Sequence, residues 1–499
     1  MEKSTLEIPA KSASGVSAQA ASVPRLMLLM RGFFSLFFIY FLLPNLLFVI
    51  LGKYILLTRA VFNVDYLLLG VFRGTLGGAV SSVLYFLILA LDALSSLCGI
   101  YNFNPFDSLA ALPHVVNLKF SSVSGVAASV VLLASAISVL AVRIGSGKNR
   151  VVHDIGSALL IACLLFVVDV ANGTNALRPR VDALFKNPVT SAFFTLVRDI
   201  RGNYSRNEIW AARYKNASWE DSATKNLAAL ARQVSEDGTV FPFRNVVFIL
   251  VESYGFFNDQ AENLHLSQLF ESDSLKRRYR VRSGRVHFNG PTTAGEFREL
   301  CGVKAAYPDI PGENATGCLP WIFRKSGYKT ISIHGYVPMF KRLEWYPRIG
   351  FEKILFTNES KDWGDFRRCG GVFDGYCDAD MVPLLKDVLI ESRTDRKFVY
   401  WLTLNSHFPV DAQSVKNSSW ECTGRSPFER DSSVCRWMKI VHMTLGDIAK
   451  LAADPDLPPT YFVVVGDHRP PFVKKEDIEL FSPDLVPYIE LVPRSPSFP

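Results

Sequence analysis

The chain of 499 residues lacks several signatures that would fix a protein class at once. No two cysteines stand in a C-x-x-C pair, so the sequence supports neither a zinc ribbon nor a thioredoxin-type redox site. No long basic run is interleaved with aromatic residues, and we therefore expect no nucleic-acid partner. No internal repeat or low-complexity tract follows residue 24, and the length suits two or three ordinary domains.

Hydrophobic residues make up 49% of the chain, and the excess is concentrated in the first third. Residues 1–24 are rich in Ser, Ala and Lys, which predicts a disordered cytosolic tail. Residues 25–171 predict a membrane domain with about five transmembrane helices, because their apolar stretches approach or exceed the length that crosses a bilayer. These stretches are Leu26–Leu51, Ile55–Val71, Gly78–Ile100, Ser122–Val142 and Ile155–Val170. The second is the weakest, since Arg59 and Asp65 interrupt it.

Positive charge gives this membrane domain an orientation. Arg143, Lys148 and Arg150 crowd one short loop, and Arg25 and Arg31 mark the N-terminal side of the first stretch. The positive-inside rule places both groups in the cytoplasm, which exports everything after about residue 171. Residues 172–242 then predict linker helices at the outer membrane boundary, with a plain extension of the soluble domain as the alternative.

The eight cysteines divide between the two parts of the chain. Cys98 and Cys163 lie in apolar stretches, and the others all lie in the exported portion. An even number in an exported domain predicts disulfides and an oxidising compartment, although composition leaves the pairing open. We favour the sequence neighbours, with reduced structural thiols as the alternative: Cys301 with Cys318, Cys369 with Cys377, and Cys422 with Cys435.

From residue 243 the pattern alternates between strand, polar loop and helix, which is typical of an α/β domain. Its apolar strands are predicted at Asn245–Val251, Lys329–Ile333, Phe398–Leu404 and Tyr461–Val465. Polar residues follow these strands: Glu252-Ser253, His334-Gly335, Asn405-Ser406-His407 and Asp467-His468. Ligands of open α/β sheets bind beyond the carboxyl ends of the strands, so we expect a metal or phosphate site there. Each histidine taken alone is more often structural.

A helix is predicted to begin near Thr292, because Thr293 and Glu296 have capping-box spacing. The N-terminus of a helix favours an anion, and a threonine hydroxyl becomes a nucleophile when a metal ion or a base lowers its pKa. The alternative is that both threonines are only caps. Arg342 is a candidate for bidentate contact with phosphate oxygens. Lys341 and Arg348 offer similar charges.

The motifs follow one another as N-V-V-F-I-L-V-E-S, T-T-A-G-E-F-x-E-L-C-G, H-G-x-x-x-x-F-K-R, T-L-N-S-H-F-P and G-D-H. This series resembles the membrane-bound phosphotransferases of the alkaline phosphatase and sulfatase superfamily, among them lipoteichoic acid synthases and the phosphoglycerol and phosphoethanolamine transferases. The resemblance implies an N-terminal multi-span α-helical membrane domain and a C-terminal α/β domain with a mostly parallel central sheet. Residues 243–499 would be the catalytic domain, held in the periplasm by the bacterial inner membrane.

The resemblance also implies roles for single residues. Glu252, Asp467 and His468 would be ligands of one or two divalent metal ions, Zn²⁺ or Mn²⁺. Thr292 would be the catalytic nucleophile and a further ligand, with the adjacent Thr293 as a one-residue ambiguity.

Three more residues would contact the substrate. Arg342 and His407 would hold the phosphoryl group or the leaving oxygen, and His334 would have a substrate or supporting role. The implied reaction moves a phosphoethanolamine or phosphoglycerol group from a phospholipid donor to an extracytoplasmic glycan or glycolipid, through a phospho-threonine. Two alternatives are a metal-dependent phosphodiesterase or sulfatase-like hydrolase, and a non-catalytic membrane protein of envelope assembly.

Two departures from the pattern affect these expectations. A sulfatase makes its formylglycine within C/S-x-P-x-R, but Cys301 lacks this context and the Cys318 segment has Ile322 where Arg is required. Hydrolysis of sulfate esters is therefore disfavoured. The segment Arg469-Pro470-Pro471 stands where many relatives have a small or acidic residue, which leaves the choice of substrate open.

Overall fold

The computed structural model describes residues 36–54, 61–68, 78–100, 151–171, 189–194, 196–197, 218–238, 241–305, 307, 310–357, 366–369, 371, 373–392, 394–424, 427–472 and 474–494. The chain divides into two compact units. The first consists of residues 1–50, 60–93 and 131–193, and the second contains everything after residue 193 together with residues 51–59 and 94–130.

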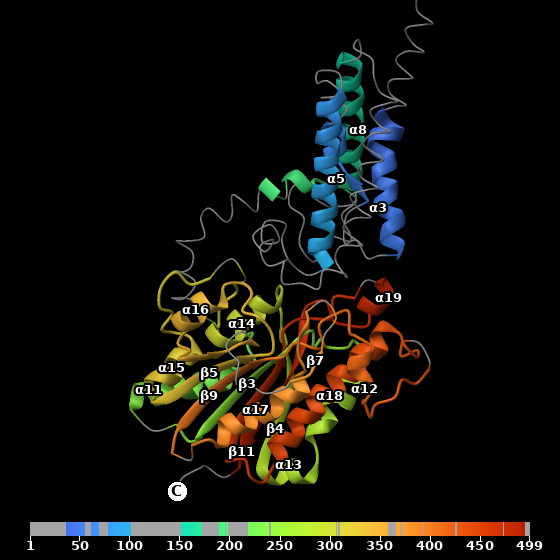
Figure 1. The fold of residues 1–499 in the computed structure, drawn as a ribbon. Helices are drawn as coiled ribbons and strands as arrows, with labels where there is room; N and C mark the ends of the chain where they lie inside the picture. The colour runs from blue at the N-terminus through green and yellow to red at the C-terminus, as the bar shows by residue number, and fades with distance from the viewer. Residues whose placement is uncertain are drawn as a thin grey trace, which may run out of the picture. The chain divides into compact units, whose positions relative to one another are not determined.

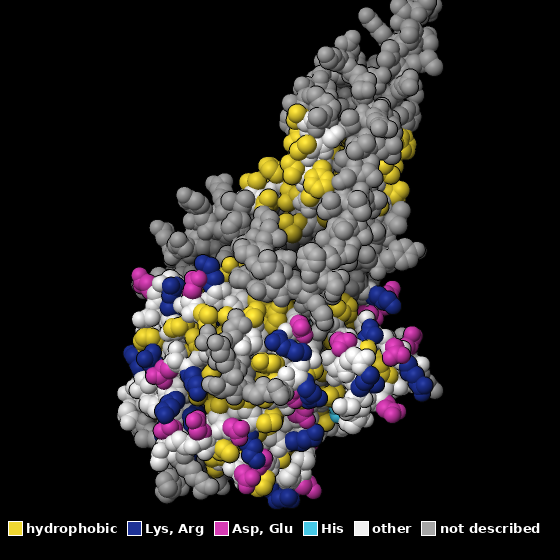
Figure 2. Space-filling view, viewed as in Figure 1, with side chains coloured by type: hydrophobic (Ala, Val, Ile, Leu, Met, Phe, Trp, Pro, Cys, Tyr) yellow, Lys and Arg dark blue, Asp and Glu magenta, His cyan; other side chains and the backbone are white. Residues whose placement is uncertain are grey.

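The helices of the N-terminal region carry mainly apolar side chains (Figure 2). The described elements are η1 (Leu36–Leu42), α3 (Leu43–Tyr54), β1 (Phe62–Asn63), α5 (Gly78–Ile100), α8 (Val151–Ala171) and β2 (Val189–Thr190). Helices are therefore present at the predicted spans 78–100 and 155–170 and over residues 36–51 of the predicted span 26–51. The predicted span 122–142 and the tail 1–24 lie outside the described residues. Among the described helices, none combines the length and the apolar content that crossing a membrane requires.

The prediction of a continuous span over Ile55–Val71 is wrong, because the short strand β1 lies inside it and pairs in parallel with β2. Polar side chains bind the backbone around β1 in place of helical hydrogen bonds. The amide of Asn63 donates to Asn45 Oδ1 (2.8 Å), and Asp65 Oδ2 accepts from the amide of Phe193 (2.8 Å). Buried backbone groups need such partners wherever a helix is interrupted.

The second unit is organised around a sheet in the order β4-β11-β10-β3-β9-β5-β6, which has seven strands among the described residues (Figure 1). Neighbouring strands from β10 to β6 pair in parallel, and β11 runs antiparallel to both β10 and β4. The predicted α/β domain with a mostly parallel sheet is thus confirmed. The strands are β3 (Asn245–Val251), β4 (Tyr279–His287), β5 (Tyr328–His334), β6 (Lys353–Leu355), β9 (Arg396–Leu402), β10 (Thr460–Gly466) and β11 (Leu485–Pro493). A separate antiparallel pair is formed by β7 (Arg368–Cys369) and β8 (Gly375–Tyr376).

Helices cover both faces of this sheet, so that the unit has three layers (Figure 1). Alternate side chains of β3 enter two different cores: Val247 and Ile249 join one, and Val246 and Phe248 join the other. The helices that contribute to the first core are α12 (Gln260–Ser267), α13 (Asp273–Arg278), α17 (Asp378–Ile390) and α18 (Ser433–Ala453). Those of the second are α11 (Lys225–Asp237), α14 (Thr292–Cys301), α15 (Leu319–Lys325) and α16 (Arg342–Ile349). Shorter helices are η4 (Gln268–Phe270), η6 (Gln413–Val415) and α19 (Lys475–Ile478).

Helix α11 lies within the segment predicted as a linker, and its apolar face joins the second core. Leu227, Ala228 and Ala231 are almost fully buried there. Before α11, Trp219 packs on Gly302, where a Cβ atom would lie 2.7 Å from the indole ring. Residues 218–237 are therefore packed as part of the α/β unit.

The three predicted disulfides are present: Cys301–Cys318, Cys369–Cys377 and Cys422–Cys435. Cys301 ends α14, and Cys318 immediately precedes α15. Both of these cysteines are fully buried, so the bond ties two helices of the second core together.

Candidate active site

The carboxyl ends of the neighbouring strands β3 and β10 bring two acidic residues together. Val251 and Gly466 are register partners, and Glu252 and Asp467 are the next residues along each strand. Gly466 is required at this point, because a Cβ atom there would lie 1.9 Å from the carbonyl oxygen of Tyr254. Parallel pairing thus produces the convergence that the apolar runs predict.

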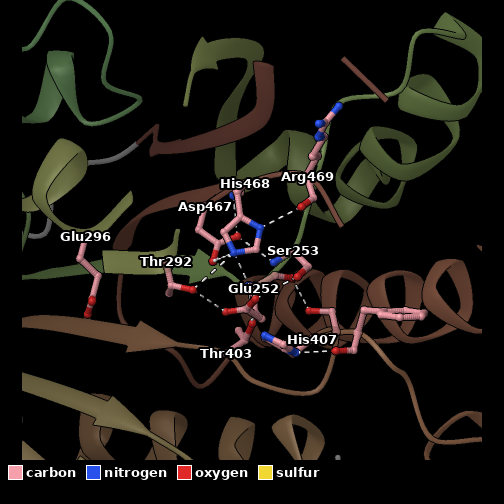
Figure 3. Close-up of polar contacts among 12 residues, drawn as sticks. Glu252, Ser253, Thr292, Glu296, Thr403, His407, Asp467, His468 and Arg469 are labelled. Atoms are coloured by element: carbon pink, nitrogen blue, oxygen red, sulfur yellow. Dashed lines mark hydrogen bonds and ion pairs between the residues drawn. The ribbon is translucent and has the colours of Figure 1, made fainter. Parts of the chain in front are cut away.

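Glu252, Asp467 and His468 form a buried cluster whose ligand atoms all lie within 4.8 Å of one another (Figure 3). Asp467 Oδ1 accepts hydrogen bonds from the amides of Ser253 (2.7 Å) and His468 (2.6 Å). Asp467 Oδ2 is buried and has no hydrogen-bond donor. An orphaned carboxylate oxygen inside a protein is unfavourable, and a cation would satisfy it. Two carboxylates and an imidazole suit either Zn²⁺ or Mn²⁺.

Backbone contact fixes the tautomer of His468. Its Nδ1 lies 2.8 Å from the carbonyl oxygen of Arg469, which can only accept, so Nδ1 carries the hydrogen. Nε2 then faces the carboxylates, 3.4 Å from Asp467 Oδ2 and 3.5 Å from Glu252 Oε1. Burial opposes protonation of this imidazole, but Asp467 and Glu252 raise its pKa above the ordinary value. A neutral imidazole oriented by a backbone carbonyl is the form that binds metal ions.

The two carboxylates of the cluster differ in their pKa. Burial raises the pKa of Asp467 to about 8, and the charge of Glu252 adds to this effect. Burial also opposes ionisation of Glu252, but His407 and His468 lower its pKa below the ordinary value. Two carboxylates so close together do not both ionise easily without a cation, which favours a proton held within the cluster. A divalent ion would displace that proton, which makes its affinity dependent on pH.

Thr292 is the first residue of α14, and its hydroxyl faces this cluster (Figure 3). Its Oγ1 donates to Glu252 Oε2 (3.1 Å) and lies 3.5 Å from His468 Nε2. The hydroxyl of Thr293 instead accepts a hydrogen bond from the amide of Tyr307 (3.0 Å). Of the two adjacent threonines, Thr292 is thus the one whose hydroxyl contacts the cluster.

The predicted start of α14 is correct, but the predicted capping box is wrong. Pro291 is the N-cap residue, and no side chain caps the helix. Glu296 does not reach back toward Thr293, because it forms a buried ion pair with Arg342. Tertiary contacts have replaced the local bonds that the spacing suggested.

Arg342 is engaged by the protein itself. Its Nη2 donates to Glu296 Oε2 (2.9 Å), and its Nε lies 3.2 Å from both carboxylate oxygens. The hydroxyl groups of Tyr346 and Tyr400 also donate to Glu296. The described contacts of Arg342 therefore place it at the side of α14, where it stabilises the helix that carries Thr292. A contact with the phosphoryl group remains a prediction.

His407 lies beside the cluster (Figure 3), whereas the hydrogen bond of His334 goes to the backbone of β9. Figure 3 shows His407 beside Glu252, and its Nδ1 donates to the carbonyl of Phe408 (2.7 Å). Burial lowers the pKa of His407, so its Nε2 acts as an acceptor at neutral pH. His334 binds the carbonyl of Leu402 through Nδ1 (2.9 Å), and burial followed by the charge of Arg342 lowers its pKa to about 3. His334 therefore stays neutral.

Two residues without a predicted role form hydrogen bonds with Glu252. Ser253 has a left-handed backbone (φ 54°), which is strained for a residue other than glycine, and its hydroxyl donates to Glu252 Oε1 (2.9 Å). Thr403 Oγ1, just beyond β9, accepts from the amide of Glu252 (2.9 Å). The only sequence signal for either was its place at the end of a strand.

The segment Arg469-Pro470 holds His468 in place. The carbonyl of Arg469 fixes the imidazole, while its side chain points away from the cluster (Figure 3). Pro470 approaches Gly255 so closely that a Cβ atom on this glycine would lie 2.8 Å from the proline ring. The segment that departs from the motif pattern of the relatives therefore helps to hold the cluster in place.

Comparison with known proteins shows what this unit is similar to. A lipoteichoic acid synthase, LtaP from Listeria monocytogenes, is 17% identical and aligns over 53% of this chain and 72% of its own (TM-score 0.35). The phosphoglycerol transferase GacH from Streptococcus pyogenes, solved with sn-glycerol-1-phosphate, is 16% identical over 55% and 76% (TM-score 0.36). The periplasmic domain of EptC from Escherichia coli, in a complex with Zn, is 16% identical over 50% and 73% (TM-score 0.31). No curated protein matches the chain. The family model described as Sulfatase matches residues 244–484.

Proposed function

We propose that the chain is a phosphotransferase that moves a phosphoethanolamine or phosphoglycerol group from a phospholipid to an extracytoplasmic glycan or glycolipid through phospho-Thr292. The observation that carries this proposal is the hydroxyl of Thr292, which donates to Glu252 and lies beside Asp467 and His468. A hydroxyl becomes nucleophilic when an adjacent base accepts its proton. The match of residues 244–484 to the sulfatase family model supports an enzyme of the phosphotransferase or hydrolase type.

The metal site of this proposal consists of Glu252, Asp467 and His468, with Thr292 as a further ligand. The orphaned Asp467 Oδ2 and the acceptor nitrogen of His468 support one or two divalent ions, Zn²⁺ or Mn²⁺. A bound ion would supply positive charge to the phosphoryl oxygens and make the threonine hydroxyl more acidic.

The proposed reaction has two displacements. In the first, Thr292 Oγ1 attacks the phosphorus of the donor, and the bond from phosphorus to the diacylglycerol oxygen breaks. The proton of Thr292 passes to Glu252, which accepts from this hydroxyl, and then to the departing oxygen. In the second, a hydroxyl of the acceptor attacks phosphorus and gives its proton to Glu252, the bond from phosphorus to Thr292 Oγ1 breaks, and this proton passes to Thr292 Oγ1. The N-terminus of α14 favours the anionic phosphoryl group throughout, and His407 beside Glu252 would hold it or the leaving oxygen.

We further propose that residues 25–171 anchor the enzyme in the bacterial inner membrane with the catalytic unit in the periplasm. The apolar composition of these residues supports this placement, as do the exposed apolar side chains of α8: Leu159, Leu160, Leu164, Phe166, Val167 and Val170. The disulfides support an oxidising compartment. A phospholipid donor would be within reach of such an enzyme.

Replacement of the nucleophile tests the proposal. Thr292→Ala should leave a folded protein that binds metal but has almost no turnover, whereas Thr293→Ala should lose only one hydrogen bond, worth about 1 kcal/mol, and stay active. Mass spectrometry of the trapped adduct would report both the modified threonine and the transferred group.

An adduct on Thr293, or full turnover by Thr292→Ala, would refute phospho-Thr292. Product analysis with and without a glycan acceptor separates transfer from hydrolysis, because a hydrolase would release the same phosphoryl product in both reactions. Failure of the wild-type protein to bind zinc or manganese would favour a non-catalytic protein.

A further inference from the structure

We propose that Arg298 is a positioning residue that holds the Asp467-His468 segment against α14, with Glu299 orienting its guanidinium. The inference rests on the metal-dependent function proposed above. Arg298 follows Thr292 on the same helix, and it is only 4% exposed. It stands at the unspecified position of the motif T-T-A-G-E-F-x-E-L-C-G, and the sequence assigned it no role.

The guanidinium of Arg298 binds backbone carbonyl groups at the carboxyl ends of the strands, where the cluster lies. Its Nη2 donates to the carbonyl of Gly466 (2.8 Å), and its Nη1 donates to the carbonyls of Asp467 (3.3 Å) and His287 (3.4 Å). The side chain thus connects α14 to the ends of β10 and β4. Because these bonds reach the carbonyl of Asp467, its carboxylate remains directed toward the cluster.

Contacts from several elements determine where the Asp467 side chain points. Its amide donates to the carbonyl of Val251 (3.2 Å), and its Oδ1 accepts from the amides of Ser253 and His468. A Cβ atom on Gly295 would lie 3.0 Å from the Cβ atom of Asp467, so α14 packs directly on it. Arg298 binds the remaining backbone polar group, the carbonyl. Without this bond the peptide after Asp467 could rotate and turn Oδ2 away from His468.

Glu299 makes a buried cation possible at this place. Its Oε1 accepts from Arg298 Nε (2.7 Å), and both side chains are almost fully buried. An isolated charge in a protein interior is costly, whereas a paired one with satisfied hydrogen bonds is tolerated. The planar fork of arginine serves three carbonyls and one carboxylate together, and the ammonium of lysine cannot reproduce this geometry.

The same carboxylate also binds the chain that enters α11. Glu299 Oε2 accepts from Ser222 Oγ (2.7 Å) and from the amide of Thr224 (3.0 Å), and its Oε1 accepts from the amide of Ala223 (3.2 Å). Glu299 thus holds the residues that lead into α11, including the amide of its N-cap residue Thr224. One buried bridge therefore runs from residues 222–224 through Glu299 and Arg298 to the metal cluster.

Zinc titration of the full-length protein by calorimetry tests this role, with Arg298→Met and Arg298→Lys as variants. We expect both to weaken zinc binding by about 10- to 100-fold, as loss of a residue that orients a ligand does. Turnover should fall through kcat with KM unchanged, because Arg298 does not contact the substrate. Added guanidinium ions should restore part of the activity of Arg298→Ala, and methylammonium should not.

Arg282→Met is the matched control. Arg282 Nη1 lies 3.2 Å from the buried carboxylate of Glu490, so this change likewise removes the arginine partner of a buried carboxylate. Circular dichroism checks folding. If Arg298→Met unfolds, Arg298→Lys provides the test, because it keeps the positive charge beside Glu299. Wild-type zinc affinity and turnover in a folded Arg298→Lys would overturn the positioning role. If the wild-type protein has no turnover but the variants still bind zinc more weakly than it does, the positioning role is supported and the proposed function is refuted.

Discussion

At the scale of single residues, the candidate site depends on a position without a side chain. Gly295 lies in α14, where a Cβ atom would be 3.0 Å from Asp467 Cβ and 3.2 Å from its Cα. Alanine usually stabilises a helix by about 0.5–1 kcal/mol relative to glycine. Gly295→Ala should nevertheless push α14 from Asp467 and weaken both zinc binding and kcat.

Gly446→Ala in α18 is the control for this prediction, because a Cβ atom there meets nothing within 4 Å. It should raise the unfolding temperature and leave turnover unchanged. Equal effects of the two substitutions on zinc affinity, measured by calorimetry, would contradict the close-packing explanation.

Asp378 gives the fold a dependence on pH. Its carboxylate accepts from the amides of Leu404 (3.0 Å) and Asn405 (2.8 Å), which precede His407, and burial raises its pKa to about 7. The folded state therefore binds this proton more tightly than the unfolded state does, whose pKa is near 3.8. The contribution of Asp378 to stability is complete below the unfolded pKa and is lost as pH rises through about 7.

The free energy of unfolding should thus decline more steeply between these pH values in the wild type than in Asp378→Asn, which cannot titrate. Urea denaturation at a series of pH values measures both slopes. Parallel curves for the two proteins would show that Asp378 does not titrate in this range.

At the scale of elements, α14 carries several of the buried charged side chains of the unit. The carboxylate of Glu296 binds Arg342 and two tyrosine hydroxyls, and it is fully buried. Removing one partner of a buried ion pair costs about 3–5 kcal/mol, because the other charge remains without compensation. Glu296→Ala should therefore destabilise the protein by this amount in chemical denaturation.

The double variant Glu296→Gln with Arg342→Met should be markedly more stable than Glu296→Ala, since neither charge is left in the core. The solvent-exposed pair of Lys329 and Asp395 provides the comparison, and Asp395→Asn should change stability little. A double variant as unstable as the single one would indicate that packing, and not charge, sets the cost.

At the scale of the whole molecule, the packing of α11 defines the smallest part that should fold. Leu227, Ala228 and Val234 bury the apolar face of this helix in the second core, and Glu299 binds the amide of Thr224 just before it. A fragment of residues 218–499 should therefore unfold cooperatively at a high urea concentration. A fragment of residues 243–499 exposes that core and should have a clearly lower midpoint or aggregate. Equal midpoints would show that α11 adds nothing to the unit.

Much of the architecture was predictable because its signals are local. Continuous apolar runs identified β3, β5, β9 and β10, the strands buried on both faces. Three strands of this sheet were missed: the short β6 at one edge, and β4 and β11 at the other. Arginines at positions 280, 282 and 285 interrupt the apolar pattern of β4, and Pro487 lies inside β11. Pairing of β11 with both β10 and β4 makes strands of these two segments.

By itself the sequence determined the order of the motifs, the parallel α/β class and the neighbouring disulfides, since each depends on residues close together in the chain. The tertiary structure decided which threonine faces the acids, that Arg342 pairs with Glu296, and that Arg298 binds the strand end beyond β10. These contacts join residues far apart in the sequence, and no local period or spacing encodes them. An arginine that will bind backbone carbonyls looks, in the sequence, like any other charged residue of a helix.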